Sequence, residues 1–460
     1  MDIRELFENE YIGKNITVQG WIRNHRKQAH FGFIDLSDGT CFEHLQVIYD
    51  DKLDNFEDIA KLKIGSAVTV DGILQESPKE GQKFELILKK IKLEGDCSDD
   101  FPIQPKRHTR EFLREVAYLR PRTNLFQAVF RVRSKAAFAI HKYFQDNGYL
   151  YVTTPLITCA DCEGSGEMFR VTKFDMNDMP VLKDGKVDFS KDLFGKEAFI
   201  TGTGQLHGEA FALAYKKIYT FGPTFRTEES NTKTHANEFW MIEPEIAFCN
   251  LVGLMDIEED MLKYVVKYVL DNCSSEIEFF DNFVEKGLRN KLENLVNSSF
   301  KRITHDEAIT LLKEASVKWE FMPEYGEDIA KEHERYITEY YNCPVFIYDW
   351  PKDIKSFYMK QNDDGKTVAA VDLEIPGVGE LMGGSQREDD YDKLINRMTE
   401  IGMTTDTKEG LYWYTNLRRY GGCYHSGFGL GFERLLIYLT GVENIRDVIP
   451  FPRTPYNADF

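Results

Sequence analysis

Long apolar runs are missing from this sequence. No stretch of about 18 apolar residues occurs and no basic-then-apolar leader follows Met1, so we expect neither a membrane span nor a secretory signal. Cysteine is sparse as well: 8 residues in a chain of 460 are typical of reduced thiols and not of a disulfide framework. These absences favour a cytoplasmic protein that has no membrane as a partner.

Positive charge is also in short supply. The chain holds 57 Lys and Arg against 76 Asp and Glu, a net charge of −19, which argues against nonspecific nucleic-acid binding over the whole surface. The segment 101–135 departs from this balance, with a net charge of 9 − 2 = +7. Its basic residues are Lys106, Arg107, Arg110, Arg114, Arg120, Arg122, Arg131, Arg133 and Lys135. We interpret this local excess as phosphate contact, with a solvated helix face as the alternative.

The length predicts two or three domains, and the first hundred residues predict a small β domain. Gly, Asp, Asn and Ser turns separate five β-prone runs there, which suits a Greek-key barrel of the oligonucleotide-binding (OB) kind over residues 1–100. The runs are Ile16–Arg23, Phe31–Leu36, Glu43–Tyr49, Ala67–Leu74 and Phe84–Leu93. Prolines at 102, 105 and 121 indicate a basic hinge or linker over residues 101–122.

Residues 123–460 alternate helical and strand patterns, so we expect an α+β domain with an antiparallel sheet flanked by helices. Helices are predicted for Phe126–Asn147 and Met255–Leu270. The predicted strands are Leu150–Thr158 (which contains Pro155), Phe199–Gly202, Ile218–Arg226, Glu238–Ala247, Val368–Glu374 and Gly379–Arg387, and a strand–glycine–helix unit covers Gly427–Leu439. Residues 275–365 are charge-rich, carry no recognisable chemistry and are expected to be an insertion.

The most informative stretch is 218–248, which predicts an antiparallel hairpin with a polar loop. Period-two alternation places Arg226 and Glu228 on one face, and Phe239 on the returning strand lies within reach of it. An arginine, a carboxylate and an aromatic ring suit an α-phosphate, a base amino group and a purine plane. Ordinary cross-strand ion pairs would explain the charges, but not the Lys233 and His235 of the loop.

Two further segments extend this pattern. Gly427–Leu435 (GFGLGFERL) places Arg434 where the chain enters a helix, after glycines that allow close approach to a ligand. Asp372 and Glu380 bracket a tight turn, and paired carboxylates near phosphate-binding arginines indicate a magnesium site. An exposed acidic turn is the alternative for this pair.

Together these segments resemble the class II aminoacyl-tRNA synthetases. The run around Pro155 is similar to the first motif of that class, FRTE…HANEF to the second and GLGFERL to the third. The order of the motifs and the amino-terminal barrel resemble the aspartyl/asparaginyl/lysyl subgroup, and most of all its bacterial-type asparaginyl enzymes. The resemblance runs from about Val18 to Phe460 and includes specific strings such as EFWMIEPE, GGSQRE and ENIRDVIPFPRTP.

The resemblance implies ATP-dependent ligation of L-asparagine to tRNA(Asn) through an asparaginyl-adenylate, with AMP and pyrophosphate released. It implies a homodimer through the region around Pro155. The ATP-binding residues would be Arg226 (α-phosphate), Glu228, His235, Phe239 (adenine), Glu380 and Arg434 (tail phosphates), with Arg226 and Arg434 catalytic and Asp372 and Glu380 holding Mg²⁺. The amino-acid-binding residues would be Glu163, Thr203, Gln205, Glu243 and Arg387, and the anticodon-binding residues Arg23, Arg26, Phe33 and Gln46.

Asparagine is favoured over aspartate by three positions. Gly208 stands where the aspartate enzymes carry a lysine, while Glu243 and Arg387 could accept from and donate to a carboxamide. An aspartate ligand would meet the charge of Glu243 in a partly desolvated site. His207 would soften this discrimination if it were protonated.

Several rival interpretations fit the residues less well. Aspartyl-tRNA ligation is disfavoured by Gly208, and a synthetase-like asparagine synthetase would have no use for the barrel. A noncatalytic nucleic-acid-binding module would not explain the ATP residues. The glycines at 202–208 resemble a dinucleotide fingerprint, but an antiparallel hairpin follows, and Cys159 with Cys162 lacks a second pair at zinc spacing.

Overall fold

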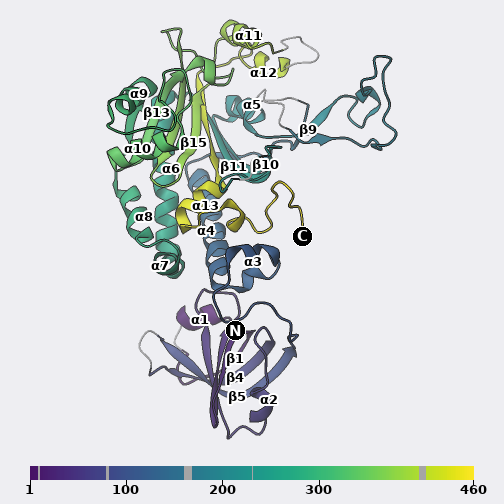
Figure 1. The fold of residues 1–460 in the computed structure, drawn as a ribbon, viewed down its shortest axis with the longest axis vertical. Coiled ribbons are helices and arrows are strands. Elements are labelled where there is room, and N and C mark those ends of the chain that lie inside the picture. The colour runs from purple at the N-terminus through teal and green to yellow at the C-terminus, as the bar shows by residue number, and fades with distance from the viewer. Residues whose placement is uncertain (9–10, 79–81, 160–167, 230–231, 404–410) are drawn as a thin grey trace. The chain divides into compact units, whose positions relative to one another are not determined.

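The computed structural model describes residues 1–460 except 9–10, 79–81, 160–167, 230–231 and 404–410. The chain forms two compact units, residues 1–131 with Phe460 and residues 132–459 (Figure 1). Our catalytic-domain boundary at residue 123 differs from this division by a few residues, because the first two turns of one helix belong to the first unit.

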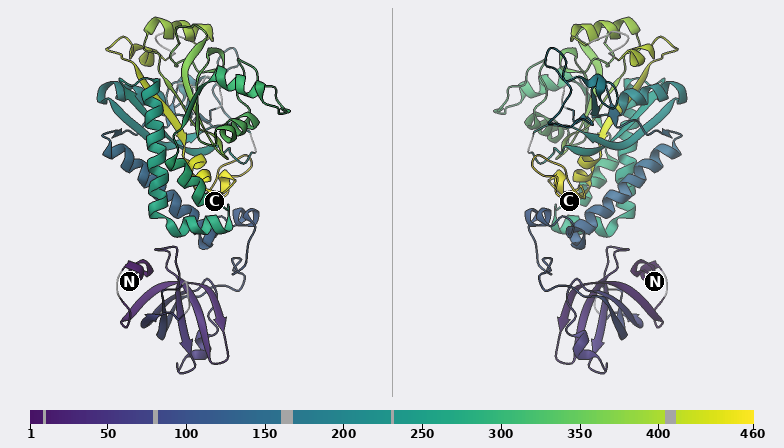
Figure 2. Two further views of the ribbon diagram at one scale, coloured as in Figure 1. Left: turned by 90° about the vertical axis from the view of Figure 1, so that its left-hand side faces the viewer. Right: turned by 90° about the vertical axis from the view of Figure 1, so that its right-hand side faces the viewer.

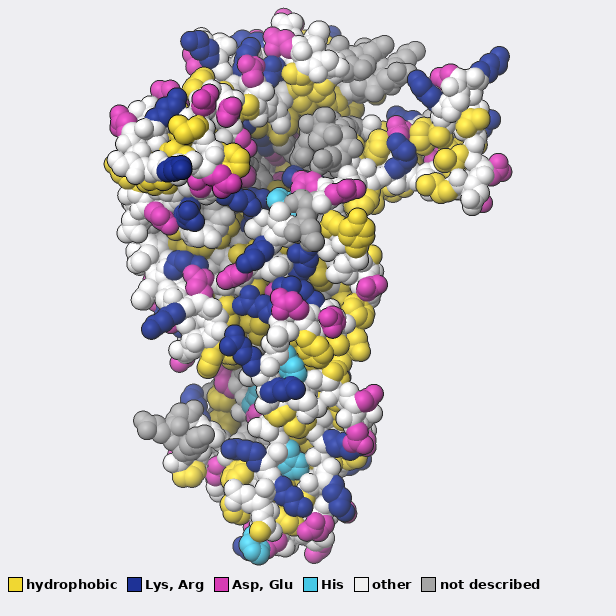
Figure 3. Space-filling model, in the orientation of Figure 1, with side chains coloured by type: hydrophobic (Ala, Val, Ile, Leu, Met, Phe, Trp, Pro, Cys, Tyr) yellow, Lys and Arg dark blue, Asp and Glu magenta, His cyan; other side chains and the backbone are white. Residues whose placement is uncertain are grey.

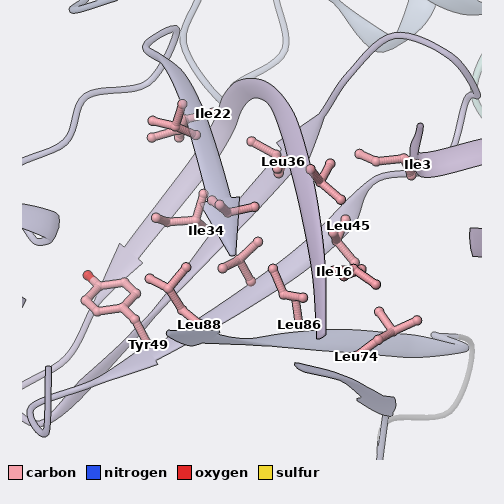
Figure 4. Close-up of a cluster of buried hydrophobic side chains, with 14 of the residues drawn as sticks. Ile3, Ile16, Ile22, Ile34, Leu36, Leu45, Tyr49, Leu74, Leu86 and Leu88 are labelled. Atoms are coloured by element: carbon pink, nitrogen blue, oxygen red, sulfur yellow. The ribbon is translucent and has the colours of Figure 1, made fainter. Parts of the chain in front are cut away.

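The amino-terminal unit is a closed five-stranded barrel, as predicted. Its strands are β1 (Asn15–Lys27), β2 (Phe31–Ser37), β3 (Leu45–Asp50), β4 (Ala67–Glu76) and β5 (Phe84–Gly95), in the order β1-β2-β3-β5-β4. Alternate residues of β1 are buried and exposed, so one face of each strand fills the barrel. Figure 4 shows this core, in which Ile22, Ile34, Leu45 and Leu86 meet and Ile3 of α1 (Ile3–Glu8) joins them. Helix α2 (Phe56–Ile59) packs Phe56 against the same core.

Residues 101–131 contain more structure than a linker. Helix α3 (Arg110–Glu115) is capped by Thr109, whose hydroxyl accepts from the Phe112 N–H, and the short turn η1 (Arg120–Arg122) follows. Arg120 is fully buried, with its guanidinium carbon 4.4 Å from the ring centroid of Phe126. Arg131 donates to the carbonyl oxygens of Thr40 at 3.2 Å and Cys41 at 2.9 Å. Phosphate contact is therefore wrong as an interpretation of these two arginines, which hold the fold together.

The second unit is built on an eight-stranded sheet in the order β12-β13-β14-β15-β16-β11-β10-β6. The strands are β6 (Leu150–Tyr151), β10 (Lys217–Phe225), β11 (Glu238–Ala247), β12 (Lys301–Thr304), β13 (Val345–Pro351), β14 (Thr367–Ile375), β15 (Gly379–Gln386) and β16 (His425–Gly431). All neighbours are antiparallel except β6 with β10 and β12 with β13 at the two edges. The predicted α+β class with an antiparallel central sheet is confirmed.

Helices cover the sheet. Helix α5 (Gln205–Tyr215) packs on β10 and β11, and α6 (Leu251–Asn272) packs on β14, β15 and β16. In Figure 2 the long α4 (Asn124–Asp146) and α6 run beside the sheet, where the Tyr143 hydroxyl donates to Asp260 at 2.8 Å. The remaining helices are α7 (Ser274–Phe283), α8 (Leu288–Asn297), α9 (His305–Glu314), α10 (Lys331–Tyr341), α11 (Tyr391–Glu400), α12 (Tyr412–Asn416) and α13 (Phe432–Thr440), with short turns η2 (Phe189–Lys191), η3 (Lys352–Ile354) and η4 (Ile445–Asp447).

The prediction of one strand over Leu150–Thr158 is wrong. Residues 150–151 form β6 at the edge of the large sheet, whereas β7 (Ile157–Thr158) pairs with β9 (Ala198–Ile200) in a second sheet that also holds β8 (Arg170–Val171). Pro155 lies between them and cannot donate to a strand ladder. The chain between β8 and β9 extends from the sheet and carries exposed apolar side chains (Figures 1 and 3), among them Val181, Leu193 and Phe194.

The segment 275–365 is not a separate body. Its strands β12 and β13 continue the large sheet beyond β14, and α9 packs on both of them. Helix α9 begins with a capping box between Thr304 and Glu307. In the part of the chain that the structure describes, every helix is too short or too polar to span a bilayer.

Candidate active site

The six expected ATP-binding residues line a single pocket. Arg226, Glu228 and His235 come from the loop between β10 and β11, Phe239 from β11, Glu380 from β15 and Arg434 from α13. Thr234, Ala236, Met241, Leu381, Gly429, Gly431, Glu433 and Ile445 complete the lining. Residues separated by more than 200 positions meet here because β11 and β15 both pair with β16.

The base-binding end of the pocket combines a cation, an acid and a ring. The Arg226 guanidinium carbon lies 5.5 Å from the ring centroid of Phe239, and its Nη1 lies 3.9 Å from Oε1 of Glu228. The Asn237 amide donates to the carbonyl oxygens of Arg226 at 2.8 Å and Glu228 at 3.0 Å, which fixes the neck of the hairpin. Burial lowers the pKa of His235, so this ring is neutral near pH 7 and can accept or donate one hydrogen bond.

At the other end of the pocket Glu380 lies close to Arg434. Arg434 Nη1 donates to the Glu380 carbonyl at 2.9 Å and lies 3.4 Å from its Oε2. The point beside Gly383 where other residues carry Cβ lies 3.3 Å from Oδ1 of Asp372 and 3.2 Å from Oε1 of Glu380. One oxygen of each acid therefore faces a space that any larger side chain would fill.

Asp372 has a partner that the sequence analysis missed. Lys355, directly after η3, places Nζ 2.6 Å from Oδ2 of Asp372. Burial raises the pKa of Asp372 to about 6, with Lys355 opposing the shift and Glu380 adding to it. Among the described residues no three His, Cys, Asp or Glu are grouped to hold a metal by themselves. Two carboxylates suit Mg²⁺, which commonly takes one or two protein acids together with substrate phosphates.

One of the expected amino-acid-binding residues, Glu243, lies farther along β11. Phe239, Met241, Glu243 and Glu245 project from the same face of this strand, because side chains two positions apart share a face. Phe239 and Glu243 are four residues apart, about 14 Å along the strand. A ligand with an adenine at one end and an amino acid at the other therefore fits along a single strand.

Glu243 organises the loop before α5. Its carboxylate accepts from the Thr203 hydroxyl, from the Gly204 N–H at 2.9 Å and from the Thr220 hydroxyl at 3.1 Å. Gln205, the first residue of α5, donates from Nε2 to Glu209. The structure thus brings Thr203, Gln205 and Glu243 together, whereas Glu163 lies outside the described residues.

Arg387 is buried at the end of β15 and is held by a second glutamate. Its Nε donates to Oε2 of Glu245 at 3.2 Å, its Nη2 donates to Oε1, and its Nη1 donates to Ser385 at 2.7 Å. Burial raises the pKa of Glu245 to about 7, with Arg387 opposing and Glu209 adding to the shift. The two bonds to Glu245 pre-orient the guanidinium. Sequence reasoning missed Glu245, although its position two residues after Glu243 on one strand was a signal.

Glu209 binds several buried side chains of the same region. It accepts from Arg418 Nη2 and Tyr414 Oη at 2.9 Å each, and His425 Nε2 lies 2.9 Å away. Burial acts in the opposite direction, but Arg418 and His425 hold the pKa of Glu209 well below its usual range. All of these side chains are buried, so they form a rigid network of ion pairs and hydrogen bonds next to the site.

His207 stacks on Trp413 with ring centroids 4.9 Å apart. Burial lowers the pKa of His207, so the ring is neutral near pH 7 and does not supply the positive charge that would favour aspartate.

In the barrel, three of the four expected anticodon-binding residues meet. Arg26 pairs with Phe33 across β1 and β2, with its guanidinium carbon 5.1 Å from that ring centroid, and its Nη2 donates to Gln46 at 3.3 Å. Arg23 instead donates to the Arg122 carbonyl at 2.7 Å, and burial lowers its pKa to about 10. Arg26, Phe33 and Gln46 therefore form a partly exposed surface, whereas the Arg23 side chain is bonded within the fold.

Comparison with known proteins agrees with this arrangement. Residues 109–455 match the family described as tRNA synthetases class II (D, K and N), and residues 16–94 match the OB-fold nucleic acid binding domain. The chain therefore belongs to the class II tRNA synthetases of the D, K and N group.

Individual relatives indicate which enzymes of this group the chain resembles. The chain is 58% identical over 464 residues to the asparagine–tRNA ligase of Acholeplasma laidlawii, covering 100% of both, and 54% identical to that of Clostridium beijerinckii, covering 100% and 99%. It is similar to the asparaginyl-tRNA synthetase of Pyrococcus horikoshii solved with asparaginyl-adenylate, at 33% identity, a TM-score of 0.85 and coverage of 97% and 96%. The corresponding Entamoeba histolytica complex gives 26% identity, a TM-score of 0.83 and 97% coverage of both chains. The predicted resemblance to asparaginyl enzymes is confirmed.

Proposed function

We propose that this chain ligates L-asparagine to tRNA(Asn), using ATP and passing through an asparaginyl-adenylate, with AMP and pyrophosphate released. The observation that carries the proposal is the row on β11, where the aromatic ring of the ATP pocket and the carboxylates of the amino-acid end share one strand face. The asparagine–tRNA ligases that match the chain over its full length support the choice of amino acid.

The first step needs no protein nucleophile. The carboxylate of asparagine attacks the α-phosphorus of ATP, and the bond to the bridging oxygen of pyrophosphate breaks. Arg226 binds the α-phosphate and Arg434 the tail phosphates, so that both neutralise charge as it develops. Phe239 stacks on adenine, while Glu228 and His235 contact the nucleotide. Catalysis consists of holding the two reactants in line.

Asp372 and Glu380 would hold Mg²⁺, whose bound charge offsets that of the phosphates. The fit rests on the two carboxylate oxygens that face the space beside Gly383. Gly383 leaves that space open because it has no side chain.

Selection of asparagine depends on hydrogen bonds to both the N–H and the carbonyl of its side-chain amide. Thr203, Gln205 and Glu163 bind the α-ammonium side of the ligand, Glu243 accepts from the amide N–H, and Arg387 donates to the amide carbonyl. Because Glu209 and Glu245 both lie within 4 Å of Arg387, part of its positive charge is already offset before an aspartate side chain could bind. Such polarity can reject the wrong ligand by several kcal/mol.

The second step transfers the asparaginyl group to the terminal ribose 3′ hydroxyl of tRNA, and AMP leaves. Arg26, Phe33 and Gln46 of the barrel read the anticodon, with Phe33 stacking on a base and Arg26 supplying charge. Arg23 contributes to this surface only by giving up its bond to Arg122. We keep residues 1–100, 101–122 and 123–460 as the anticodon-binding, hinge and catalytic divisions.

We further propose a homodimer through the region around Pro155, in the cytoplasm. Four neighbouring apolar side chains are 40–44% exposed there, which is unusual for a solvated edge. They are Leu150, Tyr151, Leu156 and Ile157. Strand β6 is also the last strand of the large sheet, and within the described residues its outer edge pairs with no further strand.

Pyrophosphate exchange tests the proposal. The purified chain is incubated with ATP, Mg²⁺ and labelled pyrophosphate, with asparagine, aspartate or lysine in parallel. We expect label in ATP with asparagine alone, and asparaginyl-tRNA when tRNA(Asn) is added. Equal or greater exchange with aspartate would refute the assignment, and free asparagine formed from aspartate and ammonia would favour the synthetase alternative.

A further inference from the structure

A lysine from the segment without a recognisable motif contacts one of the two candidate magnesium ligands. Lys355 Nζ lies 2.6 Å from Oδ2 of Asp372, and these side chains are only 15% and 13% exposed. An exposed ion pair usually contributes little, because both side chains lose freedom in a strongly screening solvent. This pair is shielded, so its geometry is fixed by its surroundings.

The position of Lys355 follows from the topology of the sheet edge. Ile347 on β13 pairs directly with Asp372 on β14. Trp350, three residues later, is 1% exposed and donates its indole N–H to the Ile347 carbonyl at 2.9 Å. The chain then turns through η3 and brings the Lys355 ammonium to 3.8 Å from the Trp350 ring centroid. The ammonium is thereby held between an aromatic face and a carboxylate.

The two carboxylate oxygens of Asp372 therefore have different surroundings. Oδ2 is engaged by Lys355, while Oδ1 faces the space beside Gly383, which Oε1 of Glu380 also faces. A carboxylate that is bonded through one oxygen cannot rotate that oxygen toward a metal. Only Oδ1 is then available, which suits the strict geometry that Mg²⁺ requires.

We propose that Lys355 is a positioning residue for magnesium, which engages one oxygen of Asp372 and so presents the other toward Glu380. This proposal rests on the function proposed above and deepens it. Without the ammonium, Asp372 would lose its cationic partner while Glu380 keeps Arg434, so we expect the two acids to repel each other more strongly and to move apart. A purely structural link between β13 and β14 is the alternative, since Lys355 could serve only to tie η3 to the sheet.

The test measures how strongly Mg²⁺ supports binding of a nucleotide that cannot react. The affinity for α,β-methylene-ATP is determined by calorimetry over a range of Mg²⁺ concentrations for the wild type, Lys355→Met and Lys355→Arg. Lys360→Met is the matched control, because Lys360 makes a similar 2.7 Å pair with Asp389 on the same segment. Partners that orient metal ligands are typically worth 10–100-fold in metal affinity.

We expect Lys355→Met to require at least about 10-fold more Mg²⁺ for half-maximal tightening of nucleotide binding. Lys355→Arg should recover part of the loss, and Lys360→Met should match the wild type. An unchanged Mg²⁺ requirement in Lys355→Met would overturn the proposal. A lower requirement would overturn it as well, because it would mean that the ammonium merely competes with the metal.

A double-mutant cycle separates positioning from stability. If Lys355 acts through Asp372, then adding Lys355→Met to Asp372→Asn should not raise the Mg²⁺ requirement further. An additive loss would contradict the proposal, and thermal unfolding of each variant reports any loss of fold separately. Because analogue binding needs neither amino acid nor tRNA, a wild type without asparagine-dependent exchange would refute the proposed function and leave this measurement intact.

Discussion

Replacing Glu243 by alanine perturbs the selection of the amino acid most directly. Glu243 is 6% exposed, and its carboxylate accepts from the hydroxyls of Thr203 and Thr220 and from the Gly204 N–H. Its removal therefore has two consequences: the loop before α5 loses its acceptor, and the pocket loses a negative charge. The two consequences differ in which amino acid they affect.

Loss of the contacts to the loop before α5 lowers the rate at which every amino acid is activated. A hydrogen bond to a charged group is worth about 1.5–3 kcal/mol, and part of this is recovered by water. We expect kcat/KM for asparagine to fall about 100-fold, equivalent to about 2.7 kcal/mol. Loss of the acceptor for the ligand amide contributes to this fall with asparagine, whereas loss of the negative charge changes the binding of aspartate. A ligand carboxylate about 5 Å from Glu243 is disfavoured by about 3 kcal/mol at an effective dielectric constant of about 20, so its rejection weakens by up to about 100-fold.

Pyrophosphate exchange with each amino acid measures both consequences. Thr203→Val is the matched control, because it removes one loop contact and keeps the charge. It should slow both substrates and leave the preference for asparagine over aspartate unchanged. If Glu243→Ala discriminates as well as the wild type does, then Glu243 is not the residue that excludes aspartate.

Three further predictions follow from the same structure. Burial raises the pKa of Glu258 well above its usual range, so the native state holds a proton that the unfolded chain releases above about pH 4.5, and stability falls as pH rises. In urea unfolding, the free energy of unfolding of Glu258→Gln relative to that of the wild type should rise by about 1.4 kcal/mol for each pH unit between pH 5 and 7. Parallel pH profiles of the two proteins would disprove the assignment. Glu209→Ala should lower the free energy of unfolding by about 3–5 kcal/mol, because Arg418 loses its buried counter-charge, and a loss below about 1 kcal/mol would argue against the network. Arg26→Ala and Phe33→Ala should each lower kcat/KM for tRNA charging about 10-fold with exchange unchanged, and a parallel loss of exchange would count against an anticodon role.

Periodicity in the sequence was sufficient for the elements that build the site. The run Glu238–Ala247 coincides with β11, because β-prone residues on both sides of a polar loop specify a hairpin, and from Ile242 to Ala247 both faces of the strand are buried. The hairpin pattern indicated that Arg226, Glu228 and Phe239 share one region, whereas the roles of the six ATP-binding residues came from the resemblance to the class II synthetases. Their meeting in one pocket required only the order of the strands.

Partners that come from distant elements could not be predicted in this way. Arg120 and Arg131 counted as surface charge in the sequence, but carbonyl groups and rings brought in by the fold bury or engage them. Lys355 meets Asp372 only because of the register between β13 and β14. Pro155 interrupts a run of β-prone residues, and the two halves find different partners in different sheets. In each case pairing decides the outcome, and local propensity does not.

The central claim is that β11 aligns a nucleotide and a carboxamide along one face. A crystal structure of the chain with the sulfamoyl analogue of asparaginyl-adenylate tests it most directly. The account predicts adenine stacked on Phe239, the sulfamoyl group beside Arg226, and the amide of the ligand between Glu243 and Arg387. An analogue whose side chain lies away from Glu243 and Arg387, or whose adenine avoids Phe239, would contradict it.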